Sequence, residues 1–187
     1  MTDRKKMPAP KPTWGGIRKE LNHWEAPALL ALVKDLYETS SANRDFIHAR
    51  CLPEANEAIL EKYRSAIIQQ FFPARGIGKL KLGEARKAIR DYGKATKNIP
   101  GIAELLMTYV ENGAEFTHEY GDIDERFYSS IESALHELAT LLRSQPELYE
   151  SFSDRLDEVE YLTGNVGWGF HDYVSDMVSQ LAAELEK

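Results

Sequence analysis

Apolar residues recur along most of the chain at the spacing of an α-helix. Over 170–185 they fall at i, i+3, i+4, i+7, i+8, i+11 and i+15, which places them on one side of a helix. The segments 54–71, 102–116 and 123–142 show the same apolar stripe. No segment alternates apolar and polar residues for long enough to indicate a strand, and KLKLG at 79–83 comes closest. The pattern predicts an all-α protein of about eight helices.

The expected helices form pairs. The expected pairs cover 27–51, 54–97, 102–143 and 147–185, and the last three are units near 40 residues, typical of helical-hairpin repeats. Pro53 and Pro146 stand where a first helical turn tolerates proline, and Asp122 with Glu125 three residues later resembles a capping box. We expect antiparallel hairpins, packed as an irregular bundle or as a short HEAT-like stack, although no unit repeats the letters of another.

Length and composition favour one soluble domain. The 187 residues, 43% of them hydrophobic, suffice for one core, so we expect a helical domain over 13–187 after a disordered leader over 1–12. The leader lacks the apolar stretch of a secretory signal, and the longest clean apolar run, ALLALV, is too short to cross a bilayer. The single Cys51 excludes an internal disulfide and is expected to be buried. These features predict a cytoplasmic protein that does not enter a membrane.

Charge is distributed unevenly along the chain. Residues 1–100 hold 19 Lys and Arg against 11 Asp and Glu, whereas residues 101–187 hold 4 against 19, within a net charge of −7. Eight cations and two acids lie between 73 and 97. At about 100° per residue, a helix over 82–97 gathers five of these cations on one side, away from its apolar residues. They form a predicted exposed basic stripe of Arg86, Lys87, Arg90, Lys94 and Lys97.

The sequence leaves several destinations open for this basic stripe. It could face the chain's own acidic half, within one molecule or across a dimer, or it could dock an acidic protein partner. It could instead bind phosphate or nucleic acid, or hold the anionic substrate of an enzyme. The acidic half would repel a polyanion, the aromatic residues lie on the apolar stripes, and no nucleophile with a general base is identifiable. We therefore interpret the chain as a non-catalytic interaction module.

Two glycine-rich segments resemble phosphate-binding sequences only in part. GIGKLKLG at 76–83 has a lysine after glycine but lacks the spacing and the Ser or Thr of a phosphate-binding loop. GNVGWGF at 164–170 opens a helix, so its amides could meet an anion there. Gly167, Gly169 and His171 are therefore a candidate anion site, for which a structural turn is the simpler explanation.

Histidines suggest a metal site that the sequence does not complete. Glu115 and His118 share a helical face, as do Glu132 and His136 on the next helix, and a hairpin could bring these pairs together. A di-iron site needs a second Glu-x-x-His, which is absent, so one zinc ion on His118, His136 and a carboxylate is the alternative. Solvated helix surface explains these residues more simply. We expect no metal, no cofactor and no catalytic residue; an enzyme or metal protein using these histidines or His171 remains the alternative.

Several spaced motifs resemble a known family. They are NRDF (43–46), EKYRSAIIQQFFP (61–73), ELLMTYVENGAEFTHEYGDIDERFY (104–128) and GWGFHDY (167–173). The resemblance covers most of residues 13–175 and is to a bacterial family of small, all-helical proteins of unknown function. It implies a bacterial origin and carries no activity, ligand or catalytic residue to this chain.

Overall fold

A computed structural model describes residues 11–185, and 81% of these residues are helical with no strand among them. The prediction of an all-α protein is therefore confirmed. The chain divides into two compact units, residues 1–44 and 45–187. The expected leader over 1–12 lies, except for Lys11 and Pro12, outside the described residues. The single domain over 13–187 stays a prediction.

Two helices and the start of a third make up the described part of the N-terminal unit. α1 (Trp14–Leu21) is capped by the Thr13 hydroxyl, which accepts a hydrogen bond from a backbone N–H of the first turn, and α2 (Ala26–Thr39) has Pro27 in its first turn. α3 (Ser41–Cys51) begins in this unit. No side chain described in residues 11–44 is buried. The exposed large apolar side chains of this unit are Trp14, Ile17, Trp24, Leu30, Val33 and Leu36.

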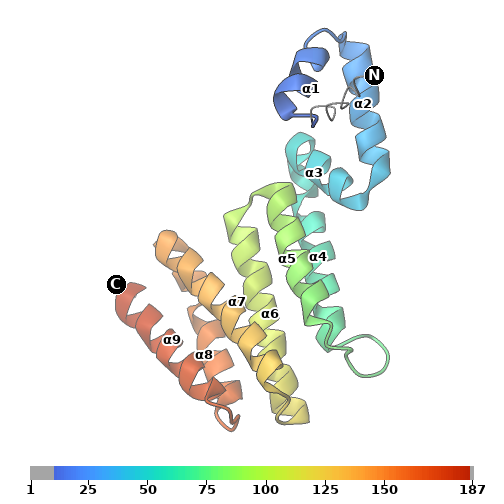
Figure 1. Cartoon of the computed structure of the whole chain (residues 1–187). Coiled ribbons are helices and arrows are strands. Elements are labelled where there is room, and N and C mark those ends of the chain that lie inside the picture. The colour runs from blue at the N-terminus through green and yellow to red at the C-terminus, as the bar shows by residue number, and fades with distance from the viewer. Residues whose placement is uncertain (1–10, 186–187) are drawn as a thin grey trace, which may run out of the picture. The chain divides into compact units, whose positions relative to one another are not determined.

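The C-terminal unit consists of three antiparallel helical hairpins that lie side by side (Figure 1). They are α4 (Asn56–Phe71) with α5 (Leu82–Thr96), α6 (Ile99–Tyr120) with α7 (Glu125–Ser144), and α8 (Ser153–Thr163) with α9 (Phe170–Leu185). The short 3-10 turns η1 (Pro53–Ala55) and η2 (Pro146–Ser151) precede α4 and α8. The central α6 packs against both α4 and α8, and α7 packs against α9. The three pairs predicted from residue 54 onward match these three hairpins, which lie next to one another in chain order.

The hydrophobic core of this unit is built around α6. Phe71 of α4 meets Tyr109 of α6 edge to face, with ring centroids 5.3 Å apart, and lies 6.4 Å from the ring of Phe127 in α7. Gly113 lets α7 approach closely, because a Cβ there would lie 2.5 Å from Cδ1 of the buried Ile131. The apolar stripes of the sequence therefore meet in one continuous core, on which α5 and its preceding loop are held.

An ion-pair network joins one helix from each hairpin. The guanidinium group of Arg155 in α8 donates through Nε to Glu111 Oε1 at 2.6 Å and through Nη1 to Glu104 Oε2 at 2.7 Å. Arg64 of α4 donates to the same Glu104 at 3.2 Å. Burial by itself would raise the pKa of Glu104, but the hydrogen bonds and charges of Arg155 and Arg64 outweigh burial and hold this pKa below its ordinary value. One carboxylate in α6 thus connects all three hairpins.

Two local expectations are wrong. α7 takes Asp124 as its N-cap, whose carboxylate accepts from the Phe127 N–H at 2.8 Å, and the expected capping residue Asp122 instead accepts from the Tyr128 hydroxyl at 3.0 Å. The turn before α7 is therefore two residues longer than the capping box implies. Cys51, expected to be buried, is exposed where α3 ends.

Candidate functional site

α5 carries an apolar face and a basic face. Its buried residues are Ala85, Ile89, Tyr92 and Ala95. They recur every three or four positions and hold the helix against α4 and α6, as the predicted apolar side requires. The cations of the basic stripe lie on the remaining surface, but their surroundings differ from one to the next.

Arg86 is the member of the basic stripe that bonds the acidic half of the chain. Its guanidinium group forms an ion pair with Glu137 of α7 and lies 5.6 Å from the centroid of the Tyr109 ring. The Arg86 side chain is only 15% exposed, and its buried Nη1 has no hydrogen-bond partner among the described residues. The prediction of an exposed stripe is therefore wrong for this arginine, which joins α5 to α7.

The other four cations of the stripe face solvent. Lys87 bonds Asp91 one turn along the helix, and this hydrogen bond raises the pKa of Lys87. The Nζ of Lys94 lies 3.9 Å from the same carboxylate. Arg90 and Lys97 have no carboxylate within ion-pair distance in the described part of the chain. One acidic group therefore offsets part of the charge of four exposed cations.

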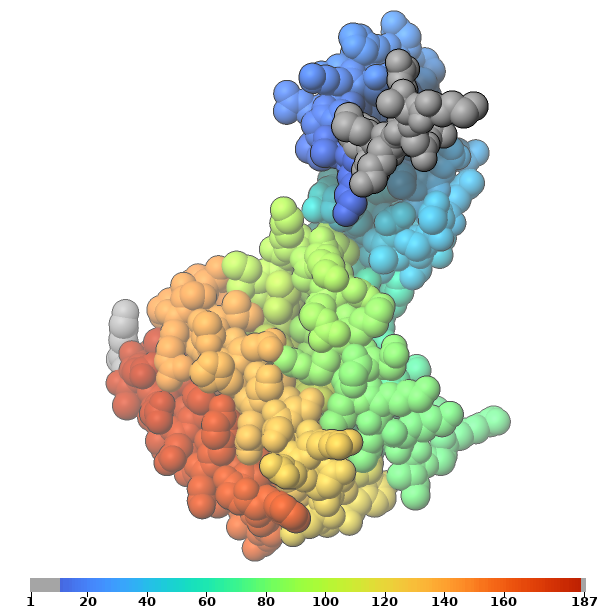
Figure 2. All heavy atoms as spheres, viewed as in Figure 1, coloured from blue at the N-terminus to red at the C-terminus, as the bar shows by residue number. Residues whose placement is uncertain are grey.

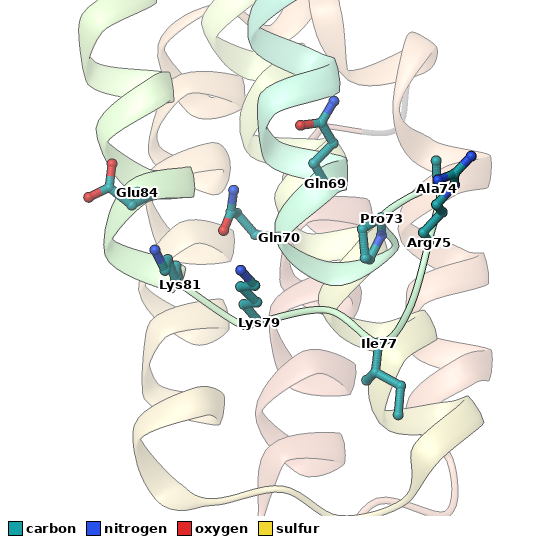
Figure 3. Close-up of a pocket in the computed structure, with 9 residues that line it drawn as sticks. All are labelled: Gln69, Gln70, Pro73, Ala74, Arg75, Ile77, Lys79, Lys81 and Glu84. Atoms are coloured by element: carbon teal, nitrogen blue, oxygen red, sulfur yellow. The ribbon is translucent and has the colours of Figure 1, made fainter.

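A hollow of about 760 Å³ lies beside the start of α5, between the end of α4 and the loop that joins the two helices. Figure 3 shows the side chains of Gln70, Lys79 and Lys81 gathered at one end of this hollow, with Glu84 beside them and Arg75 at the other end. The remaining lining residues are Gln69, Pro73, Ala74 and Ile77. The lining thus holds three cations and one carboxylate.

The loop around this hollow has a defined backbone. Leu80 donates its N–H to the Gln70 carbonyl at 3.0 Å, although its φ of 48° lies in the left-handed region that a leucine rarely adopts. Gly78 runs so close to the end of α4 that a Cβ would lie 2.0 Å from the Phe71 carbonyl oxygen. The loop projects from the surface of the unit (mint green, right, in Figure 2), with Ile77 70% exposed.

The exposed cations of the loop and α5 together form what we call the basic face. It consists of Arg75, Lys79, Lys81, Lys87, Arg90, Lys94 and Lys97. The stripe predicted from helix periodicity included the last four residues and missed the first three, because they precede the helix. Their signal in the sequence was the crowding of cations around Gly76 and Gly78 in a segment without helical periodicity.

The candidate anion site at the start of α9 is folded around an internal carboxylate. The Gly167 N–H donates to Asp122 Oδ1 at 3.3 Å, and the Nδ1 of His171 lies 3.2 Å from the Thr163 hydroxyl. The intervening Trp168 has a φ of 62° and is 66% exposed, and Gly169 has a φ of 72°. At Gly167 the anion that the amide meets is therefore the protein's own Asp122, and binding of an external anion at these residues stays a prediction.

His118 and His136 lie far apart along the α6–α7 hairpin. His118 is near the turn, with its Nδ1 3.2 Å from the Leu162 carbonyl of α8. His136 lies 11 residues after the first residue of α7, a distance of roughly 16 Å along the helix axis at about 1.5 Å per residue. Within residues 11–185, no three His, Cys, Asp or Glu side chains are grouped as a metal ion would require.

Comparisons with known proteins do not assign this chain to a family. No family model matches the sequence, and no match is found among the curated proteins or the solved structures. The resemblance of the NRDF, FFP, YGDIDERFY and GWGFHDY motifs to a bacterial family therefore stays a prediction. None of the helices described between residues 11 and 185 combines the length and apolar character needed to span a membrane.

Proposed function

We propose that this protein is a non-catalytic interaction module whose basic face docks an acidic surface of another protein. The single observation that carries the proposal is the contrast within the segment 73–97. Among the described residues, Arg86 is the one cation of the eight in this segment that pairs with the acidic C-terminal half, through Glu137. The others are exposed: Lys87 and Lys94 lie near Asp91, and the cations of the loop share their hollow with Glu84.

This contrast favours an external partner over internal neutralisation. Cations that served only the fold would be expected to bond carboxylates, as Arg64, Arg143 and Arg155 do. Exposed like charges repel one another and gain little from the fold, so a cluster of one sign is best explained by a partner of the opposite sign. Such a surface accelerates association and selects partners by charge.

Nucleic acid is the second candidate. The same basic face could neutralise phosphates, but residues 101–187 carry 19 acids against 4 cations and would repel a long polyanion. No aromatic side chain lines the hollow, so the base stacking that single-strand binders use has no support there. An acidic protein surface, which is finite in extent, suits this charge distribution better.

A lone, exposed Cys51 suits a reducing compartment, and the resemblance of the motifs is to bacterial proteins. We place the interaction in the bacterial cytoplasm, and we assign no catalytic step to it.

Capture from a lysate of the source cells, with and without nuclease, tests the proposal. The bait is the full chain, compared with Lys87→Glu/Arg90→Glu/Lys94→Glu. We expect the wild type to retain an acidic protein that survives nuclease treatment and is released by moderate salt, because exposed charge pairs are screened. The triple variant should lose it.

Arg90→Glu and Arg18→Glu form a matched pair for the same experiment. Both arginines are exposed on helices and have no ion pair among the described residues, but Arg18 lies in α1, outside the basic face. Loss of the partner with Arg90→Glu alone supports the basic face as the docking surface. Equal losses with both variants, or capture that disappears with nuclease, would reject the proposal.

A further inference from the structure

We infer that the hollow between α4 and α5 binds a phosphate group, with Lys79, Lys81 and Gln70 as its principal contacts. This inference rests on the proposed function, because the hollow is one end of the basic face. It adds a ligand class: the partner or a small molecule presents a phosphate to this hollow, while the lysines and arginine along α5 meet carboxylates.

The shape of the hollow suits a small ligand. Its volume of about 760 Å³ lies within the range of roughly 300–1,000 Å³ common for small-molecule sites. It is open to solvent on one side, so a phosphate attached to a larger molecule can enter as readily as a free one. The lining side chains come from α4, the loop and the first turn of α5.

The charges of the hollow are not used by the fold. Arg75, Lys79 and Lys81 have no carboxylate within ion-pair distance among residues 11–185. Two lysines from alternate positions, 79 and 81, lie at the same end of the hollow (Figure 3). Each ammonium group offers three donors, which match the three acceptor oxygens of a phosphate with a charge of about −2.

The carboxamide group of Gln70 adds a neutral donor to the end of the hollow that holds Lys79 and Lys81. Gln70 lies beside Lys79 and Lys81 (Figure 3). Its Nε2 makes one long hydrogen bond, of 3.4 Å, to the Ala66 carbonyl, which leaves its second N–H available. Lysines with an amide donor suit a compact anion, whereas no arginine fork or aromatic ring is present at this end to select a larger group.

The loop is organised before any ligand arrives. Leu80, between the two lysines, packs against the core and hydrogen bonds to Gln70, so its neighbours are held outward. Its left-handed φ is a strained conformation of the kind that collects at ligand sites. A loop fixed in this way loses less conformational entropy on binding than a flexible one.

Glu84 opposes a phosphate in this hollow and makes the inference testable in both directions. It is the one carboxylate of the lining and forms no ion pair with a described cation. If a phosphate enters, its repulsion by Glu84 weakens binding, so Glu84→Gln should bind more tightly. An affinity that Glu84→Gln leaves unchanged would mean that the phosphate does not bind beside this carboxylate.

The experiment follows backbone amide shifts of the 15N-labelled full chain while inorganic phosphate, pyrophosphate or O-phosphoserine is added at constant ionic strength. Sodium chloride is the control salt. We expect shifts centred on residues 75–84 for the phosphates and none for chloride. Lys79→Gln/Lys81→Gln should weaken binding about tenfold or more, since it removes two charge-assisted contacts. Glu84→Gln should strengthen binding, and Arg18→Gln, which changes an exposed arginine of α1, should leave it unchanged.

The two sources of phosphate are separated by comparing the ligands. Tighter binding of O-phosphoserine than of inorganic phosphate assigns the site to a phosphorylated partner, and the reverse order assigns it to a free ion. Shifts spread evenly over all exposed lysines, or an unchanged affinity in the double lysine variant, would overturn the inference. Lys87→Glu/Arg90→Glu/Lys94→Glu separates it from the proposed function: this variant loses the acidic partner but keeps phosphate shifts at 75–84.

Discussion

Glu104 occupies a position where one side chain serves three helices. It lies on the central α6 and accepts from arginines of both neighbouring hairpins. A carboxylate removed from water costs free energy unless it is paired, and here the pairing outweighs burial, as its lowered pKa indicates. The charges of this ion-pair network are therefore neutralised within the fold, in contrast to those of the basic face.

Arg155→Met should reduce the free energy of unfolding by about 1–3 kcal/mol at neutral pH, between the values for exposed and buried pairs. Because folding lowers the pKa of Glu104, its ionised carboxylate stabilises the fold at pH values above the ordinary pKa of 4.5. This stabilisation is lost as the pH falls through the lowered pKa. In the variant, Glu104 keeps Arg64 but loses Arg155, so its pKa moves upward. The difference in urea stability between wild type and variant should therefore be largest at neutral pH and shrink in acid.

The matched control for this measurement is Arg126→Met, which removes an exposed arginine without an ion pair among the described residues. Its stability should differ from wild type by no more than about 0.5 kcal/mol at any pH. A destabilisation by Arg155→Met that does not change with pH would indicate lost packing of the long side chain rather than lost charge.

α5 illustrates how one helix carries two kinds of cation. Its apolar face fixes its rotation against α4 and α6, and this rotation points Arg86 toward α7 while it leaves Lys87, Arg90 and Lys94 in solvent. The first cation is structural because a carboxylate and an aromatic ring meet it. The others can change without disturbing contacts between helices.

Arg86→Glu and Lys94→Glu should therefore differ in their effects on stability. The former places a carboxylate beside Glu137 in a site where the native side chain is only 15% exposed, which should cost about 2–4 kcal/mol. The latter changes a 78% exposed side chain and should alter stability by no more than about 0.5 kcal/mol. Chemical denaturation of both variants, monitored by circular dichroism, measures the difference, and equal losses would contradict this account of α5.

The two units of the chain differ in how much apolar surface they bury. The unit of residues 45–187 has a continuous core of buried side chains from six helices. The described part of residues 1–44 has none, although Trp14 and Trp24 are two of the three tryptophans of the chain. Helices as short as α1 and α2 are marginal in water without a packed face. The stability of the C-terminal unit should therefore not depend on them.

Deletion of residues 1–39 tests this expectation. The shortened chain begins at Ser40, whose hydroxyl accepts from the Asn43 N–H at 3.2 Å, so α3 keeps its start. We expect cooperative thermal unfolding with a midpoint within about 4 °C of the full chain, equivalent to about 1 kcal/mol at this size. Loss of a cooperative transition would show that the C-terminal core is incomplete without the deleted residues.

The sequence by itself determined the helices, their pairing and the segregation of charge. These are local or additive properties: a 3.6-residue period follows from the spacing of Leu, Ile and Phe along one segment, and net charge follows from counting. The buried side of α5 was predictable for the same reason, down to Ile89 and Tyr92.

The tertiary structure alone decided which charged side chains form ion pairs within the fold. Helix periodicity placed Arg86 and Arg90 on the same side of α5, but only the position of α7 distinguishes them, because Glu137 lies 51 residues away along the chain. The hollow at Lys79 and Lys81 likewise depends on Gly78 fitting over the end of α4 and on the left-handed φ of Leu80, neither of which has a periodic signal. Contacts between distant segments arise from packing geometry, and a pattern along one segment does not contain them.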